Sequence, residues 1–158
     1  MAQRNAAKRA RNACQLPPSQ SSGYLVRDAH RAFQRVLERR IARFGVARGH
    51  WYFLRVLWIE DGLTQRELSA RVGMMEPTTV IALRSMEKAG LVRRVRSRED
   101  ARRTHVSLTP LGRRLERQLL PVARQIVRDA EQGIGRPDVE VFREVIARMT
   151  KNLDRLKS

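Results

Sequence analysis

The sequence has few of the features that mark secreted and membrane proteins. Cys14 is its only cysteine, which excludes an internal disulfide and is typical of a reducing compartment. The richest apolar run, at 51–59, is too short to cross a membrane and contains Arg55. The N-terminus lacks the apolar segment that a secretory signal needs. We therefore expect a cytoplasmic protein that has no membrane partner.

Residues that could support catalysis or hold a metal are equally sparse. The sequence has no glycine-rich phosphate loop, no carboxylate pair at a catalytic spacing and no cysteine–histidine motif. Its histidines, His30, His50 and His105, lack the spacing of metal ligands, so each is expected to be a surface or packing residue. These absences argue against an enzyme, and no cofactor or metal is expected.

Negative charge is also scarce: 33 Lys and Arg stand against 16 Asp and Glu, a formal net charge of +17. Such an excess does not specify a fold, but it predicts attraction to polyanions. Nucleic acid is the favoured partner, ahead of an anionic membrane surface. The chain has 158 residues, which is enough for one domain with its own core.

Residues 1–22 carry positive charge but little that could be buried. They contain no acidic residue, and their basic side chains are mixed with Asn, Gln, Ser and a Pro-Pro pair. We expect a disordered basic arm here. It could be a solvated tail, or it could add contacts to a DNA backbone. Cys14 lies in this arm and is expected to be an incidental thiol rather than a redox sensor.

The ends of the remaining chain have the apolar spacing of amphipathic helices. This spacing predicts helices over 24–44 and 49–60, a long helix that starts at Thr109-Pro110, and a last helix from Asp138. The apolar stripes of the first helix and the last two are wide, so we expect them to pair with a second copy of the chain. The side chains expected in this interface are Leu25, Leu119, Val122, Phe142, Met149 and Leu153.

The central part of the chain predicts two short helices joined by a tight turn. The residues from Thr64 to Glu67 read T-Q-R-E, a capping box that starts a helix. Gly73 permits the turn, and Pro77 suits the first position of a second helix that runs to about Ala89. This is the helix-turn-helix arrangement, whose second helix, the recognition helix, enters the major groove of DNA.

Two strand-like segments follow, at 91–95 and 104–108. The loop between them reads R-S-R-E-D-A-R-R and is polar enough to be the exposed tip of a hairpin. Arginines at such a tip suit the narrow minor groove of A·T-rich DNA. The sequence therefore predicts a mainly α fold with a small β-wing, a winged helix-turn-helix.

The side chains expected to contact DNA lie at the two helix starts, along the recognition helix and in the wing. Helix N-terminal amides can hold phosphates, and polar side chains near the start of the recognition helix can reach base edges. Glu76 is unusual there, because a carboxylate repels phosphate unless it accepts from cytosine or pairs with an arginine. Asp100 is expected to orient Arg102. The full set is Gln65, Arg66, Glu76, Thr78, Thr79, Arg84, Arg96, Arg98, Asp100, Arg102 and Arg103.

Taken together, these motifs resemble the MarR family (multiple antibiotic resistance regulator) of winged helix-turn-helix transcription factors. The resemblance rests on L-T-Q-R-E-L-S, on T-T-V with L-R-S-M-E-K-A-G-L-V-R-R, on D-A-R-R and on L-T-P-L-G-R, which lie within 63–113. The family's wing tip has an aspartate followed two residues later by an arginine, which corresponds to Asp100 and Arg102. Met74-Met75-Glu76 departs from the small polar residues expected where the recognition helix begins.

The resemblance implies six helices in a single domain over 23–158, with dimerisation helices at 24–48 and 110–157 and a DNA-binding lobe at 49–109. It implies an obligate homodimer that represses transcription from a pseudo-palindromic operator and is released by a small aromatic ligand, a phenolic acid or an acyl thioester. The implied ligand site lies between the dimerisation helices and the lobe. It would use His30, Trp51, Tyr52, Arg55 and Trp58, for which plain core packing is the alternative.

Two other functions stay open at this point. An architectural DNA-binding protein without an effector would need only the positive charge and the basic arm. A winged module could also bind a protein partner or RNA. Footprinting separates these: a repressor protects one short pseudo-palindrome with half-sites about 10 bp apart, whereas an architectural protein protects DNA uniformly.

Overall fold

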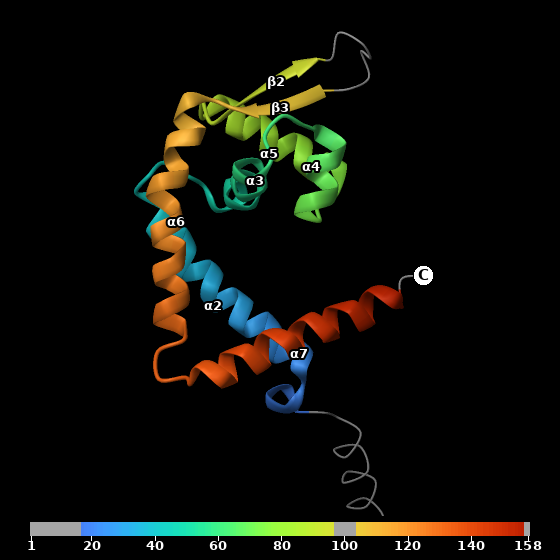
Figure 1. The fold of residues 1–158 in the computed structure, drawn as a ribbon. Coiled ribbons are helices and arrows are strands. Elements are labelled where there is room, and N and C mark those ends of the chain that lie inside the picture. The colour runs from blue at the N-terminus through green and yellow to red at the C-terminus, as the bar shows by residue number, and fades with distance from the viewer. Residues whose placement is uncertain (1–16, 97–103, 157–158) are drawn as a thin grey trace, which may run out of the picture. The chain divides into compact units, whose positions relative to one another are not determined.

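The computed structural model describes residues 17–96 and 104–156 (Figure 1). The chain divides into two compact units, Met1–Leu119 and Leu120–Ser158, whose boundary falls inside one long helix. No helix in the described ranges is long and apolar enough to span a membrane. In chain order the elements are η1 (Pro18–Gln20, a 3-10 helix), α2 (Ser22–Ala42), α3 (Arg48–Ile59), β1 (Leu63–Thr64), α4 (Gln65–Val72), α5 (Glu76–Lys88), β2 (Val92–Arg96), β3 (Thr104–Leu108), α6 (Pro110–Ala130) and α7 (Arg136–Arg155).

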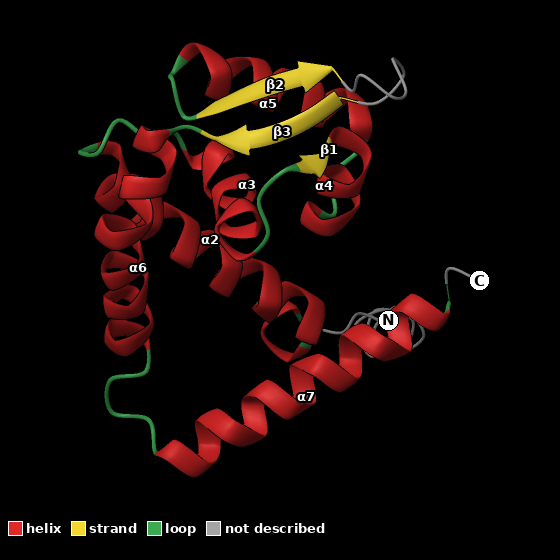
Figure 2. Ribbon diagram, turned by 45° about the horizontal axis from the view of Figure 1, so that its top comes forward, coloured by secondary structure: helices red, strands yellow, loops and turns green. Residues whose placement is uncertain are grey.

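The expected fold class is confirmed. The described residues form six α-helices and one small antiparallel sheet, with α4 and α5 in the place of the predicted helix-turn-helix. The sheet has the order β1-β3-β2, and its β2–β3 hairpin is the predicted wing (Figure 2). In that hairpin Val92 pairs with Leu108 and Arg96 with Thr104. Strand β1 was not expected: it is short, and only its pairing with β3 makes it a strand.

The start of α4 forms the capping box that its sequence predicts. The Glu67 amide donates to Thr64 Oγ1 at 3.3 Å, and the Thr64 amide donates to Glu67 Oε2 at 2.8 Å. These bonds hold the pKa of Glu67 below its ordinary value, because the Thr64 hydroxyl and amide both stabilise the carboxylate. Gly73 ends the helix in the left-handed region, at φ 71°, which glycine adopts without a steric penalty. Local chemistry thus sets both ends of α4.

The core of unit Met1–Leu119 is built from helices on both sides of the helix-turn-helix. Its fully buried side chains come from α2, α3, α4 and α5, and Val92 of β2, Val106 of β3 and Leu119 of α6 join them. Burial of one such side chain contributes roughly 1.5–3 kcal/mol. This core holds α4 and α5 in a defined orientation, which is what a recognition helix requires. The largest members are Ile41, Phe53, Leu54, Leu57, Leu68, Leu83, Met86 and Leu119.

Two expectations are corrected by the fold. Residues 17–22 were expected to be disordered, but Pro18 opens a 3-10 turn and Ser22 begins α2. The Ser21 amide donates to the carbonyls of Pro17 and Pro18, each at 3.2 Å, which orders this segment. Leu119 was expected at the dimer interface, yet its exposed fraction is 0%. Its own chain already covers it, so a second copy cannot.

Gly112, at the start of α6, has no room for a side chain. A Cβ built there would lie 2.2 Å from the Leu91 carbonyl oxygen, which is a backbone atom and cannot move aside cheaply. We expect Gly112→Ala to lower the free energy of unfolding by about 2 kcal/mol, the usual penalty for overpacking. Gly49→Ala is the matched control, since Gly49 also lies early in a helix and a Cβ there meets nothing within 4 Å. Urea denaturation of both variants measures the difference, and equal stability would contradict the close approach.

Candidate nucleic-acid interface and ligand pocket

Helix α5 has one buried side and one exposed side. Thr79, Leu83 and Met86 are buried, and they follow the i, i+4, i+7 spacing of a helix face. The opposite side is open to solvent, as a helix that enters the major groove must be. The exposed residues of α5 are Glu76, Pro77, Thr78, Ile81, Arg84, Ser85, Glu87 and Lys88.

Thr79 corrects the expected set of base contacts. Its exposed fraction is 0%, and its Oγ1 donates to Ser69 Oγ at 3.2 Å. Ser69 in turn donates to the Met74 carbonyl at 2.6 Å. This chain of hydrogen bonds closes the turn between α4 and α5, because it links a side chain of each helix to the backbone between them. Thr79 therefore orients the recognition helix and does not itself reach a base.

The other expected contacts at the helix starts lie at accessible positions. Gln65 is partly exposed and Arg66 exposed, in the first turn of α4. Thr78 and Arg84 lie on the open side of α5. Glu76 is exposed in the first turn of α5, where the helix dipole favours a carboxylate. Their contacts with DNA stay predictions.

The wing is held to the recognition helix by an ion pair that the sequence did not reveal. Arg94 of β2 donates to Glu87 of α5 from its Nε at 3.0 Å and from a terminal nitrogen at 2.7 Å. Its backbone amide also contacts the carboxylate, at 3.3 Å. Arg96 lies exposed at the end of β2, whereas Arg98, Asp100, Arg102 and Arg103 lie outside the described residues. The Arg94–Glu87 pair thus links α5, which is predicted to enter the major groove of DNA, to the wing, which is predicted to contact the minor groove.

Glu87 should make the attachment of the wing sensitive to acid. The hydrogen bond from Arg94 holds the pKa of Glu87 below its ordinary value of 4.5. The pair's stabilising contribution is therefore fully present above pH 4.5 and is lost as pH falls through the depressed pKa. We expect Glu87→Gln to lower the melting temperature at pH 7 and to have little effect at pH 3. Melting curves at both values test this, and Glu116→Gln on α6 serves as control. An equal loss at both pH values would contradict it.

Asp61 joins the end of α3 to the sheet and to α6. Its Oδ1 accepts from the amides of Gly62 at 2.9 Å and Leu108 at 2.8 Å. Its Oδ2 pairs with Arg113. Asp61 was not predicted as a functional residue, since nothing local in the sequence indicates partners that lie far along the chain. The one available signal for this role was the position of Asp61, a carboxylate shortly before β1 and the start of α4.

His50 connects α3 with the recognition helix. Its Nε2 lies 2.9 Å from Ser85 Oγ, and its ring is buried. Its Nδ1 is buried and has no hydrogen-bond partner in the described part of the chain. Burial lowers the pKa of His50, because it disfavours the charged ring. His50 thus packs against α5 through its contact with Ser85.

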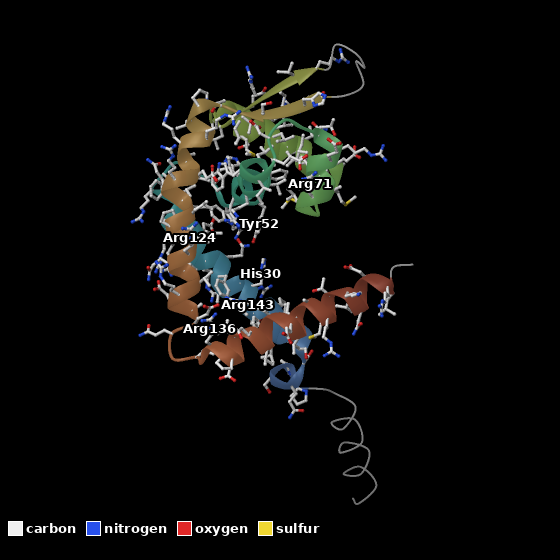
Figure 3. All side chains as sticks on the ribbon, in the orientation of Figure 1. His30, Tyr52, Arg71, Arg124, Arg136 and Arg143 are labelled. Atoms are coloured by element: carbon white, nitrogen blue, oxygen red, sulfur yellow. The ribbon has the colours of Figure 1, made fainter. Side chains whose placement is uncertain are left out.

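A hollow of about 580 Å³ opens between α2, α3 and Met74, which lies in the turn between α4 and α5. It contains two of the five side chains expected to bind a ligand, His30 of α2 and Tyr52 of α3, which Figure 3 labels. Gln34 joins them: its Nε2 lies 3.4 Å from His30 Nε2 and donates to the Tyr52 hydroxyl. The hollow is lined by His30, Arg31, Gln34, Arg35, Arg48, Gly49, Tyr52 and Met74.

The other three expected ligand residues do not line this hollow. Trp51 is buried, and its ring meets that of Trp58 edge to face at 5.9 Å. Trp58 donates from Nε1 to the Gly112 carbonyl at 2.9 Å. Arg55 lies over the Trp51 ring at 5.8 Å. Trp51 is a core residue here, the alternative explanation that the sequence left open, and Trp58 packs against it while staying partly exposed.

Side chains expected at a dimer interface are exposed in both units, each considered by itself. On α2, Leu25 is exposed beside Tyr24 and Val26. On α7, Phe142 is 61% and Leu153 59% exposed, while Met149 is partly covered. On α6, Val122 is partly covered. Large exposed apolar faces of this kind mark interaction surfaces.

Comparison with known proteins agrees with this geometry. A model described as the MarR family matches residues 44–103. The HTH-type transcriptional regulator TtmR of Methylorubrum extorquens is 33% identical over 93 residues, 59% of this chain but only 48% of TtmR. The HTH-type transcriptional regulator PetP of Rhodobacter capsulatus is 31% identical over 121 residues, which are 77% of this chain and 73% of PetP. The crystal structure of a MarR transcriptional regulator from Methanosarcina mazei Go1 has a TM-score of 0.76 at 26% identity, over 84% of this chain and 96% of that one.

Proposed function

The chain belongs to the MarR family of DNA-binding winged helix-turn-helix transcriptional regulators, and we propose that it is a homodimeric repressor that a small aromatic anion releases from a pseudo-palindromic operator. The observation that carries the proposal is the open side of α5. The helix is fixed by hydrogen bonds to α4, α3 and the wing, while Thr78, Arg84 and Lys88 face solvent. The net charge of +17 adds a long-range attraction to the DNA backbone.

Selection from random duplexes, followed by footprinting on the selected site, tests the DNA-binding part. We expect one short protected pseudo-palindrome whose half-sites are about one helical turn apart. Reporter expression from a promoter that carries this site should fall when the protein is present. Uniform protection without a preferred sequence would instead support an architectural DNA-binding protein, for which the charge alone suffices.

The proposed ligand site is the hollow between α2 and α3. Its volume lies in the range of small-molecule sites. Arg31, Arg35 and Arg48 supply positive charge, and Tyr52 supplies an aromatic face and a hydroxyl. This combination suits a carboxylated aromatic compound or its acyl thioester. Arg48 also forms an ion pair with Glu38, at 3.4 Å. This pair is exposed and therefore weak, so it competes little with a ligand for Arg48.

Met74 supplies a route from this hollow to the recognition helix. Its side chain lines the hollow, and its carbonyl accepts the hydrogen bond from Ser69. The next residue, Met75, occupies the N-cap position of α5. A ligand that displaces Met74 would therefore disturb the hydrogen bonds that close the turn, and α5 would lose its orientation. This accounts for release without any contact between ligand and DNA.

A thermal-shift screen of aromatic acids and their acyl thioesters tests the ligand part. A compound that binds the native state raises the melting temperature by mass action. We expect that rise in the unaltered chain and in an Arg124→Gln control, and its loss when Arg31 and Arg35 are both changed to Gln. The same compound should dissolve the DNA complex. An equal rise in the double variant would place the ligand site elsewhere.

A further inference from the structure

The open side of α5 has an apolar residue at its centre. Ile81 is 69% exposed, although isoleucine is ordinarily among the most buried residues. Successive residues of an α-helix turn by about 100°, so Ile81 points about 140–160° away from each of the buried residues Thr79, Leu83 and Met86. Ile81 therefore lies, with Lys88, on the side of α5 that projects away from the core.

The neighbours of Ile81 on this side can attract DNA but cannot cover its apolar surface. Thr78 lies one turn before it, and Arg84 and Lys88 lie one and two turns after it; all three are exposed. Cations one and two turns after an apolar group fit a polyanion that also carries apolar groups. They do not fit an apolar protein partner, which would have to desolvate them.

Hydrogen bonds from α5 to its neighbours fix the direction in which Ile81 points. The helix is tied to α4 through Thr79 and Ser69, to α3 through Ser85 and His50, and to the wing through Glu87. The β-branched side chain itself has one strongly preferred rotamer in a helix. Ile81 is thus presented to the groove without freedom to turn aside, which is the preorganisation that selective contact requires.

Base chemistry leaves one suitable partner for such a side chain. Isoleucine neither donates nor accepts a hydrogen bond, so it cannot satisfy the amino, carbonyl or N7 groups that line the major groove. Thymine alone of the four bases presents a methyl group there. We propose that Ile81 is a specificity-determining residue that reads the C5 methyl of a thymine in each half-site. The proposal rests on the proposed DNA-binding function and names one contact within it.

Replacing thymine by uracil tests the contact, because uracil pairs identically and lacks only the methyl group. Each thymine of the selected site is replaced in turn, in both half-sites together, and the dissociation constant is measured by gel shift at one salt concentration. The proteins are the unaltered chain, Ile81→Ala, Ile81→Val and the control Ile59→Ala, whose isoleucine is exposed on α3. Melting curves confirm that each variant is folded.

At one thymine position we expect uracil to weaken binding of the unaltered chain about fourfold per half-site, the worth of one buried methyl group. Uracil should weaken binding of Ile59→Ala by the same factor, and it should weaken binding of Ile81→Val by most of that factor. Ile81→Ala should bind the thymine and uracil sites equally. The proposal is overturned if no uracil affects the unaltered chain, or if uracil weakens Ile81→Ala as much. If selection yields no preferred DNA site, the proposed function itself fails. If the protein selects a site but no thymine-to-uracil change affects binding, only the role of Ile81 fails.

Discussion

Asp61→Ala is expected to lower the free energy of unfolding by about 3 kcal/mol, because it leaves two amides without their acceptor and removes an ion pair. The Gly62 and Leu108 amides donate to Asp61 Oδ1 at 2.9 and 2.8 Å, and alanine offers no oxygen that could accept from them. Only 22% of the Asp61 side chain is exposed, so solvent compensates little. Urea denaturation followed by circular dichroism gives the value.

Two further variants separate the causes. Asp61→Asn keeps an acceptor oxygen and loses only the charge that pairs with Arg113, so its loss should stay below about 1 kcal/mol. Asp28→Ala is the matched control, because Asp28 is exposed and pairs only with its neighbour Arg27. If Asp61→Ala were as stable as Asp28→Ala, Asp61 would not be what joins α3, β3 and α6.

If the proposed dimer forms through α7, the pair of changes Phe142→Glu and Leu153→Glu should yield monomers and weaken binding to the selected DNA site about 100-fold or more, since two linked half-site contacts become separate events. Both side chains are exposed on α7, at 61% and 59%, so charge at either position is expected to leave the monomer folded. Leu119 is not used for this test, because its burial within the chain would make any polar substitution unfold the protein. Sedimentation velocity measures the mass, and gel shift measures the affinity.

Ile59→Glu is the control for this pair, since Ile59 is an exposed isoleucine at the end of α3. It should leave mass and affinity unchanged. An intact dimer in the double variant would move the interface away from α7. Monomers that still bind the operator with full affinity would show that the two-fold arrangement is not needed for recognition.

The helix-turn-helix could be predicted because its signals are local. A threonine and a glutamate three residues apart satisfy each other's backbone donors wherever they occur, so Thr64 and Glu67 start α4 without help from the rest of the chain. Gly73 adopts a conformation that other residues avoid, and Pro77 lacks a donor that the first turn would leave unpaired. The strands of the wing were predicted for the same reason, from alternation over a few residues.

Individual roles were harder to assign, because polarity alone does not tell which side of a helix is covered. Thr79 was grouped with Thr78 as a polar residue near the start of the recognition helix, yet its spacing to Leu83 and Met86 puts it on the buried side. Leu119 and Phe142 are both large apolar residues, but Leu119 is buried by its own chain and Phe142 is exposed. Periodicity predicts that a stripe exists, and tertiary packing decides what covers it.

The sequence by itself determined the family, the order of helices and strands, the start and end of α4 and the positive charge that favours DNA, since all of these follow from neighbouring residues or from composition. The tertiary structure alone decided the partners of Asp61, the pairing of Glu87 with Arg94 and the link between Ser69 and Thr79. It also buried Trp51 in the core, packed Trp58 against it, and left His30 and Tyr52 at the hollow. Such contacts join residues that only folding brings together, because hydrogen bonds and ring contacts act over a few ångströms in space and leave no periodic trace along the chain.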